Sequence, residues 1–117
     1  MALQLKTKLD NEYGEVVPLL EAYGRNAIDA YDLVKGLAAK APDIIRGVMS
    51  AFNPFNMREA ATLGEWIGTY EFTKKVVEAF SAYGIVKKAD SPIAKYELTD
   101  AGKRVLIAYY RYVAAVQ

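Results

Sequence analysis

The chain has 117 residues, a length that fits one domain with its own hydrophobic core. It contains no cysteine and no histidine, which excludes disulfides, thiol chemistry, Ser-His-Asp triads and zinc sites built on those residues. The 15 basic and 14 acidic residues give a net charge of +1, whereas proteins that bind phosphate backbones often carry a clear basic excess. Any nucleic-acid surface must therefore be a local patch.

The first forty residues are predicted to form an arm and one long helix. Residues 1–12 are polar and favour an arm or a short extended segment. From Glu15 onward, apolar side chains recur every three or four residues as far as Ala38, with Pro18 tolerated in the first turn. The apolar positions spread well beyond one face, so this helix needs cover on several sides.

A second helix is predicted to begin at Pro42 and Asp43 and to end before Pro54. Its inner stripe consists of Ile44, Ile45, Val48, Met49 and Phe52. Asn56, three residues before Glu59, then fits the N-cap of a short third helix.

A further helix is predicted to run to Tyr83, where Gly84 stops it in the left-handed conformation. Its start is open, because Trp66 and Thr69 are both reasonable first residues and Gly68 weakens any helix that runs through it. Its core face is formed by Phe72, Val76, Ala79, Phe80 and Tyr83.

The C-terminal third is predicted to hold a β-hairpin and a last helix. The segments 85–89 and 94–98 fit two strands joined by a Ser-Pro turn, with Ile85 as a core position. Thr99, followed by Asp100, is typical of a helix cap, and the last helix carries a long apolar stripe. The predicted fold class is therefore mostly α with a small two-stranded β-hairpin in one domain, 1–117.

The helices at the two ends carry more apolar surface than a chain of this size hides internally. Monomers rarely tolerate large exposed apolar patches, so we expect a homodimer that buries these helices. The tyrosines of the last helix are interpreted as core or dimer interface, not as a base-stacking surface or ligand cage. The expected interface residues are Leu20, Tyr23, Ala27, Tyr31, Val34, Tyr109, Tyr112 and Val113.

No apolar run approaches the length that crosses a bilayer, and the N-terminus has no continuous apolar core of the kind that marks a secretory signal. We therefore expect a cytoplasmic protein. Glutamine occurs only at positions 4 and 117, and scarcity of cysteine and glutamine is compatible with a thermophilic source.

The order of the elements and two short motifs resemble a winged helix-turn-helix domain. The residues that carry the resemblance are Phe80, Gly84, Ile85, Val86, Tyr96, Leu98, Thr99 and Gly102. They are similar to the small bacterial and archaeal transcriptional regulators of the MarR, PadR and ArsR type. The resemblance implies a helix-turn-helix core and wing over 43–97, an arm and dimerisation helix over 1–40, and a C-terminal dimerisation helix over 98–117. The turn of the motif falls near Gly64 or near Gly68, depending on the end from which it is counted.

The same resemblance implies that the helix before the hairpin enters the major groove and that the hairpin, as the wing, touches the backbone. The charges on the solvent face of that helix cancel in i,i+4 Glu/Lys pairs, which are also typical of a plain exposed helix. The wing carries three lysines, more than the protection of an edge strand requires. The expected DNA contacts are Arg58, Tyr70, Thr73, Lys74, Lys75, Lys87, Lys88 and Lys95.

The functional prediction is a homodimeric, DNA-binding transcriptional regulator. The alternative is a winged-helix module for protein–protein contacts in a transcription complex or other assembly, which the near-neutral charge and the balanced helix face favour. We expect no enzyme activity, since the glycines stand singly and the carboxylates are scattered as on solvated helix edges. We expect no metal and no cofactor.

Overall fold

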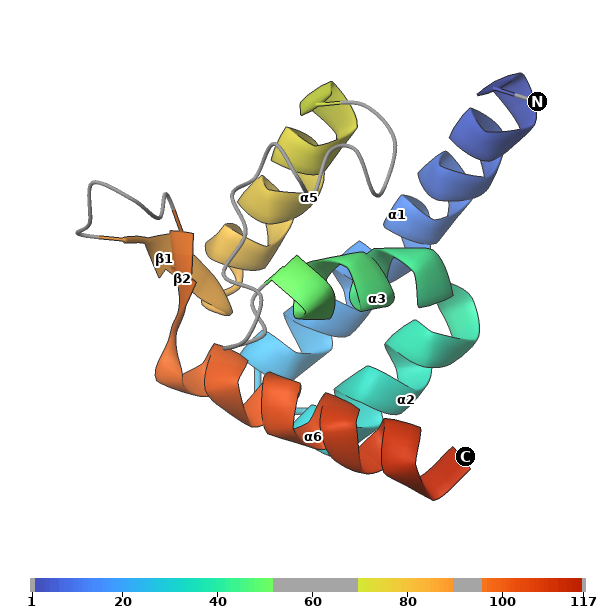
Figure 1. Cartoon of the computed structure of the whole chain (residues 1–117). Coiled ribbons are helices and arrows are strands. Elements are labelled where there is room, and N and C mark those ends of the chain that lie inside the picture. Colours follow the sequence, from blue (N-terminus) through green and yellow to red (C-terminus); the bar gives the residue numbers. More distant parts are fainter. Residues whose placement is uncertain (1, 52–69, 90–95, 117) are drawn as a thin grey trace.

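The computed structural model of the chain describes residues 2–51, 70–89 and 96–116, and Figure 1 shows their path. Five helices and one two-stranded sheet lie in these ranges: α1 (Ala2–Gly24), α2 (Ala30–Lys40), α3 (Pro42–Ala51), α5 (Tyr70–Ala82), β1 (Val86–Lys88), β2 (Tyr96–Leu98) and α6 (Asp100–Val116). The expected class, mostly helical with a small antiparallel hairpin, is confirmed at this level. The short helix expected from Asn56 and the Ser-Pro turn lie outside the described residues.

Helix α1 begins at Ala2, so the expected arm over residues 1–12 is wrong. Leu9 is 4% exposed, which shows that the buried stripe of this helix extends into the segment that had been expected to be an arm. Pro18 consequently lies inside the helix and not in its first turn. Because proline has no N–H, the carbonyl of Gly14 loses its usual helical donor there.

The single long helix expected from Glu15 to Ala38 is two helices. Asn26 has φ = 59°, a left-handed conformation that asparagine adopts more easily than most residues. Asp29 then caps α2, since its side chain accepts the backbone N–H of Asp32 at 2.8 Å. Both helices bury their apolar stripes in the same core. The apolar period therefore continues across the turn, and the sequence pattern does not reveal where the first helix ends.

Helix α3 begins at Pro42, as expected, and its N-terminus is capped from another helix. The Glu12 Oε1 atom on α1 accepts the backbone N–H of Asp43 at 3.0 Å and of Ile44 at 3.2 Å. Pro42 has no N–H, so this carboxylate serves the first two free donors of the helix. Glu12 is only 5% exposed, and its Oε2 atom has no hydrogen-bond partner in the described structure. Burial raises the pKa of this carboxyl above its ordinary value.

One apolar core joins all the described elements. Helix α6 packs against α2, α2 packs against α1 and α3, and α5 contacts both α1 and β1 (Figure 1). The Tyr23 hydroxyl on α1 donates to the carbonyl of Ala101 at 3.0 Å, which ties α1 to the first turn of α6. The largest fully buried side chains are Phe80, Leu20, Leu33, Leu37, Ile44, Ile45, Met49, Ile85, Val16, Val34 and Val48.

Thr99 holds the junction between α5, the hairpin and α6. Helix α5 ends at Ala82, and Gly84 has φ = 79°, which confirms the expected left-handed stop. The Thr99 N–H donates to the carbonyl of Ile85 at 3.0 Å, and its hydroxyl lies 2.5 Å from the Gly84 carbonyl and 3.0 Å from that of Ile85. The Thr99 Oγ1 atom accepts the N–H of Gly102 at 3.0 Å, so Thr99 caps α6 as predicted.

Close packing at this junction makes Gly102 necessary. A Cβ atom at this position would stand 2.1 Å from the carbonyl oxygen of Ile85, which is backbone and cannot turn away. We expect Gly102→Ala to lower the free energy of unfolding by about 1–3 kcal/mol, because α6 or the hairpin must shift. The matched control is Gly14→Ala in α1, where nothing lies within 4 Å of the added atom. Gly14→Ala should raise the free energy of unfolding by about 0.5–1 kcal/mol. Urea unfolding measures both, and equal effects would contradict the packing argument.

The buried carboxyl of Glu12 makes stability depend on pH. Its pKa is raised in the folded protein, so the folded state keeps a proton that the unfolded chain releases first. The contribution of Glu12 is therefore fully present below the unfolded pKa and is lost as pH rises through the folded pKa. In Glu12→Gln this loss disappears, while the side-chain carbonyl still accepts the N–H groups of α3. We expect the unfolding free energy of Glu12→Gln, relative to the unsubstituted protein, to increase from pH 4 toward pH 7. Urea titrations across this range measure it, and a constant difference would show that Glu12 is ionised equally in both states.

Candidate nucleic-acid interface

The face of α5 that was expected to meet DNA is exposed, in agreement with its helical spacing. Lys74, Lys75 and Glu78 face solvent, whereas Val76 and Phe80 on the other side are buried. Tyr70 and Thr73 lie at the start of α5, and their side chains are outside the described set. Arg58 and Lys95 also lie outside the described residues, so four of the eight expected contacts can be placed.

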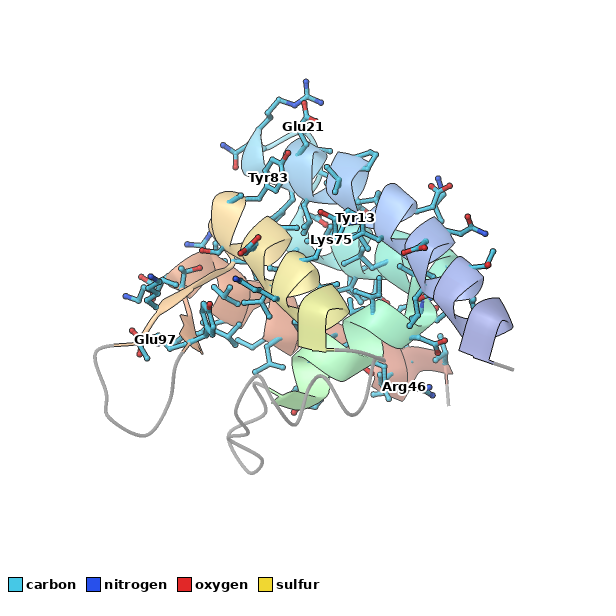
Figure 2. All side chains as sticks on the ribbon, turned by 90° about the horizontal axis from the view of Figure 1, so that it is seen from above. Tyr13, Glu21, Arg46, Lys75, Tyr83 and Glu97 are labelled. Atoms are coloured by element: carbon cyan, nitrogen blue, oxygen red, sulfur yellow. The ribbon has the colours of Figure 1, made fainter. Side chains whose placement is uncertain are left out.

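Lys75 contacts α1. Its Nζ atom lies 4.1 Å from the centre of the Tyr13 ring, a distance typical of a cation–π interaction. Figure 2 shows the two labelled side chains together between α5 and α1. The head group of Lys75 is therefore already engaged within the chain, and binding a phosphate would require it to leave the ring.

Lys74 occupies the opposite flank of the exposed face. Successive residues of an α-helix are about 100° apart around its axis, so Lys74 points away from the side on which Lys75 meets α1. Strand β1 contacts α5 as well, and Lys88 at the end of this strand is exposed. Neither Lys74 nor Lys88 forms an ion pair with the described residues. These two lysines are the described cations that remain available on the expected surface.

The hairpin pairs one of its lysines internally. Its register places Lys87 opposite Glu97, and the Lys87 Nζ atom lies 3.5 Å from the Glu97 Oε1 atom. Both side chains are exposed, so this cross-strand pair is weak, on the order of 0.2–1 kcal/mol. Lys88 lies opposite Tyr96 and faces the other side of the sheet. The positive charge of the described part of the hairpin therefore rests mainly on Lys88.

The expected dimer residues fall into two groups. Leu20 and Val34 are 0% exposed within one chain, so they belong to its own core and have no surface for a second copy. Tyr109 is half-buried, and burial raises the pKa of its phenol. Tyr31 and Tyr112 pack edge to face with ring centres 6.4 Å apart, which joins α2 to α6. The remaining members are Tyr23 and Val113, which are half-buried, and Ala27, which is exposed.

Helix α6 also carries exposed apolar side chains that were not among the expected site residues. Ile107 is 55% exposed and Tyr110 is 44% exposed, whereas the predicted stripe of this helix faces the core. The positions lie three residues apart, so they share one face. The signal was present in the sequence, because the apolar residues of this helix cover more positions than one stripe needs.

A further polar cluster among the described residues lies around the Glu12 cap. The Lys8 Nζ atom is 2.6 Å from Asp43 Oδ2, and the Arg46 guanidinium is 3.2 Å from Asp43 Oδ1. The hydrogen bond and charge of Lys8 hold the pKa of Asp43 below its ordinary value, and Asp43 in turn raises the pKa of Lys8. These charges neutralise one another at the start of α3. Among the described residues, no group of acidic side chains is arranged to hold a metal ion.

Comparison with known proteins gives no relative for the chain: no family model, no curated protein and no solved structure matches it. Within the described ranges, no helix has both the length and the apolar character needed to cross a bilayer.

The contact between Lys75 and Tyr13 predicts measurable coupling between α5 and α1. In a double-mutant cycle of Lys75→Met and Tyr13→Leu, we expect a coupling free energy of about 0.5–1 kcal/mol, because only the pair has a cation over a ring. The control cycle combines Tyr13→Leu with Lys74→Met, one residue away, and should give no coupling. Unfolding in urea provides all the free energies. Equal coupling in the two cycles would exclude a specific interaction.

Proposed function

We propose that the chain is a DNA-binding winged helix-turn-helix protein and a transcriptional regulator of the MarR, PadR or ArsR type. The observation that carries the proposal is the junction at Thr99. There, hydrogen bonds of 2.5–3.0 Å connect Thr99, which follows β2, to Gly84 and Ile85 between α5 and β1. A further bond of 3.0 Å connects Thr99 to Gly102 in the first turn of α6. A helix and a wing that must touch one duplex need such a fixed relative position.

The contacts assigned to DNA differ in strength. Lys74 and Lys88 reach the phosphates directly, since both are exposed and unpaired among the described residues. Lys87 leaves its ion pair with Glu97 to bind a phosphate, which costs little free energy because the pair is exposed. Lys75 leaves the Tyr13 ring to do the same, which costs about 0.5–1 kcal/mol. Arg58, Tyr70, Thr73 and Lys95 complete the proposed surface.

In this proposal the regulator acts as a homodimer in the cytoplasm and catalyses no reaction. The half-buried side chains near the contact between Tyr31 and Tyr112 are the part of the expected interface that retains exposed area. A two-fold pair of chains sets two α5 helices into successive major grooves.

A second candidate is a winged-helix module that binds another protein and does not read DNA. It is favoured by the internal engagement of Lys75 and Lys87, which removes two of the expected cations from a free surface. It is also favoured by the exposed Ile107 and Tyr110, which have no role in a duplex contact through α5 and the hairpin.

A salt series separates the two candidates. We expect the chain to bind random duplex DNA with an affinity that falls steeply as salt increases, because each bound phosphate releases counterions. Lys74→Ala and Lys88→Ala should each reduce the slope of log K against log salt by about one. Arg25→Ala, which removes an exposed cation in the turn between α1 and α2, is the control and should leave the slope unchanged.

Fluorescence anisotropy with labelled duplex measures these slopes, and sedimentation of the same samples gives the mass. A flat slope, or no binding at low salt, rejects DNA binding and leaves the protein-binding candidate. A mass of one 13.0 kDa chain at micromolar concentration rejects the dimer.

A further inference from the structure

The outer face of α6 combines exposed apolar side chains with cations that form no ion pair with the described residues. We define this face by Lys103, Arg104, Ile107, Tyr110 and Arg111, all of which are exposed. Their spacing of three and four residues places them on one side of the helix, with Ile107 at the centre. Val116 is also exposed, but helical geometry turns it toward the other side.

The cations of the outer face lie close together on one helix and have no acidic partner among the described residues. Within the described residues, Lys103, Arg104 and Arg111 form no ion pair, although Asp100 lies one turn before Arg104. Asp100 is the single acid of α6 and stands at its first residue. Elsewhere in the described ranges, Lys8, Lys40, Arg46 and Lys87 each pair with a carboxylate, whereas Lys74 and Lys88 form no ion pair with the described residues. The balanced net charge therefore conceals one face that is strongly basic.

These two properties define the chemistry of an occupant. Ile107, 55% exposed, contributes affinity when an apolar side chain covers it. The cations on both sides of it require carboxylates at the rim of the same occupant. An amphipathic helix with an apolar stripe and flanking acidic residues satisfies both conditions, because its side chains recur at the same three- and four-residue spacing.

A second copy of this chain does not fit the outer face. If two α6 helices packed antiparallel around Ile107, Arg104 of one copy would face Arg111 of the other, and the repulsion would occur twice by symmetry. Double-stranded DNA fits poorly as well, since phosphates would cover Ile107 without offering it an apolar partner.

We propose that the outer face of α6 binds an acidic amphipathic helical segment of another protein. This site is separate from the surface of α5 and the hairpin, and it does not depend on whether that surface binds DNA. In a regulator it would let the protein hold DNA and a protein partner at the same time.

The test uses a synthetic probe of defined chemistry. The probe is a peptide of about 18 residues with leucine at helical spacing and glutamate on both flanks of the leucine stripe. Its control has the same composition with the leucines distributed around the helix. Amide chemical shifts of the labelled chain should change along α6 around Ile107 and Tyr110 with the probe and remain unchanged with the control peptide. Binding should weaken as salt increases, because charges contribute to it.

Variants of exposed residues connect the binding to the face. Ile107→Gln removes the apolar centre while keeping a good helix former, and Arg104→Glu with Arg111→Glu reverses the rim charge. Each change should weaken the affinity for the probe about tenfold, which corresponds to about 1.4 kcal/mol of binding free energy. The matched control is Arg25→Glu, a charge reversal at an exposed position outside α6, which should change affinity less than twofold.

Three results would overturn the proposal. The first is an absence of binding at about 1 mM probe, the weakest affinity that a short helix contact should show. The second is a mass in sedimentation that falls to that of a monomer in Ile107→Gln, because a second copy would then be the occupant. The third is a duplex DNA that shifts the α6 amides while the acidic peptide does not. If the chain binds the peptide but does not bind DNA, the proposed function is rejected and the proposed site on α6 is retained.

Discussion

The structure depends on one crowded contact, in which the carbonyl oxygen of Ile85 meets Thr99 and the first turn of α6. Both the backbone N–H and the hydroxyl of Thr99 lie at hydrogen-bonding distance from this oxygen. Gly102 has no Cβ atom, so the backbone of α6 can approach the Ile85 carbonyl closely. Since Gly84 directs the chain into this position, the end of α5 and the start of α6 meet where the two strands begin and end. The hydrogen bond from Tyr23 to Ala101 then connects α1 to the same junction.

The features that sequence predicted well are those set by local backbone chemistry. Gly84 and Thr99 identified a helix end and a helix start because left-handed stops and hydroxyl caps need particular residue types. The turn between α1 and α2 was missed, although Asn26 and Asp29 are also typical of such a turn. There the apolar period passed through the break without interruption, because two consecutive helices bury their stripes in one core. Glu12 is one of the carboxylates that the sequence spacing assigns to solvated helix edges, because no local pattern reveals a cap that reaches across 31 residues.

The sequence predicts which residues lie on the candidate surfaces, but not which of their charged groups are free to bind a partner. The sequence placed Lys74, Lys75, Lys87 and Lys88 correctly on exposed elements. It could not show that Lys75 lies over Tyr13 or that Lys87 pairs with Glu97, because both contacts depend on how separate elements are brought together. The reverse holds for α6, where exposed cations that form no ion pair with the described residues surround an exposed isoleucine. Packing thus decides which charges are already satisfied inside the chain.

The hydrogen bond from Tyr23 to Ala101 also has a consequence for the order of folding. It joins residues 78 positions apart, whereas the contact of Thr99 with Ile85 spans 14. By loop-closure entropy the longer connection costs about 1.5 kcal/mol more when formed from the open chain. Chain entropy therefore favours closing the hairpin and the start of α6 first, and docking α1 onto them afterwards. Once the contact between Thr99 and Ile85 has formed, the effective chain length between Tyr23 and Ala101 is shorter. The C-terminal half of the chain therefore forms the surface against which α1 packs.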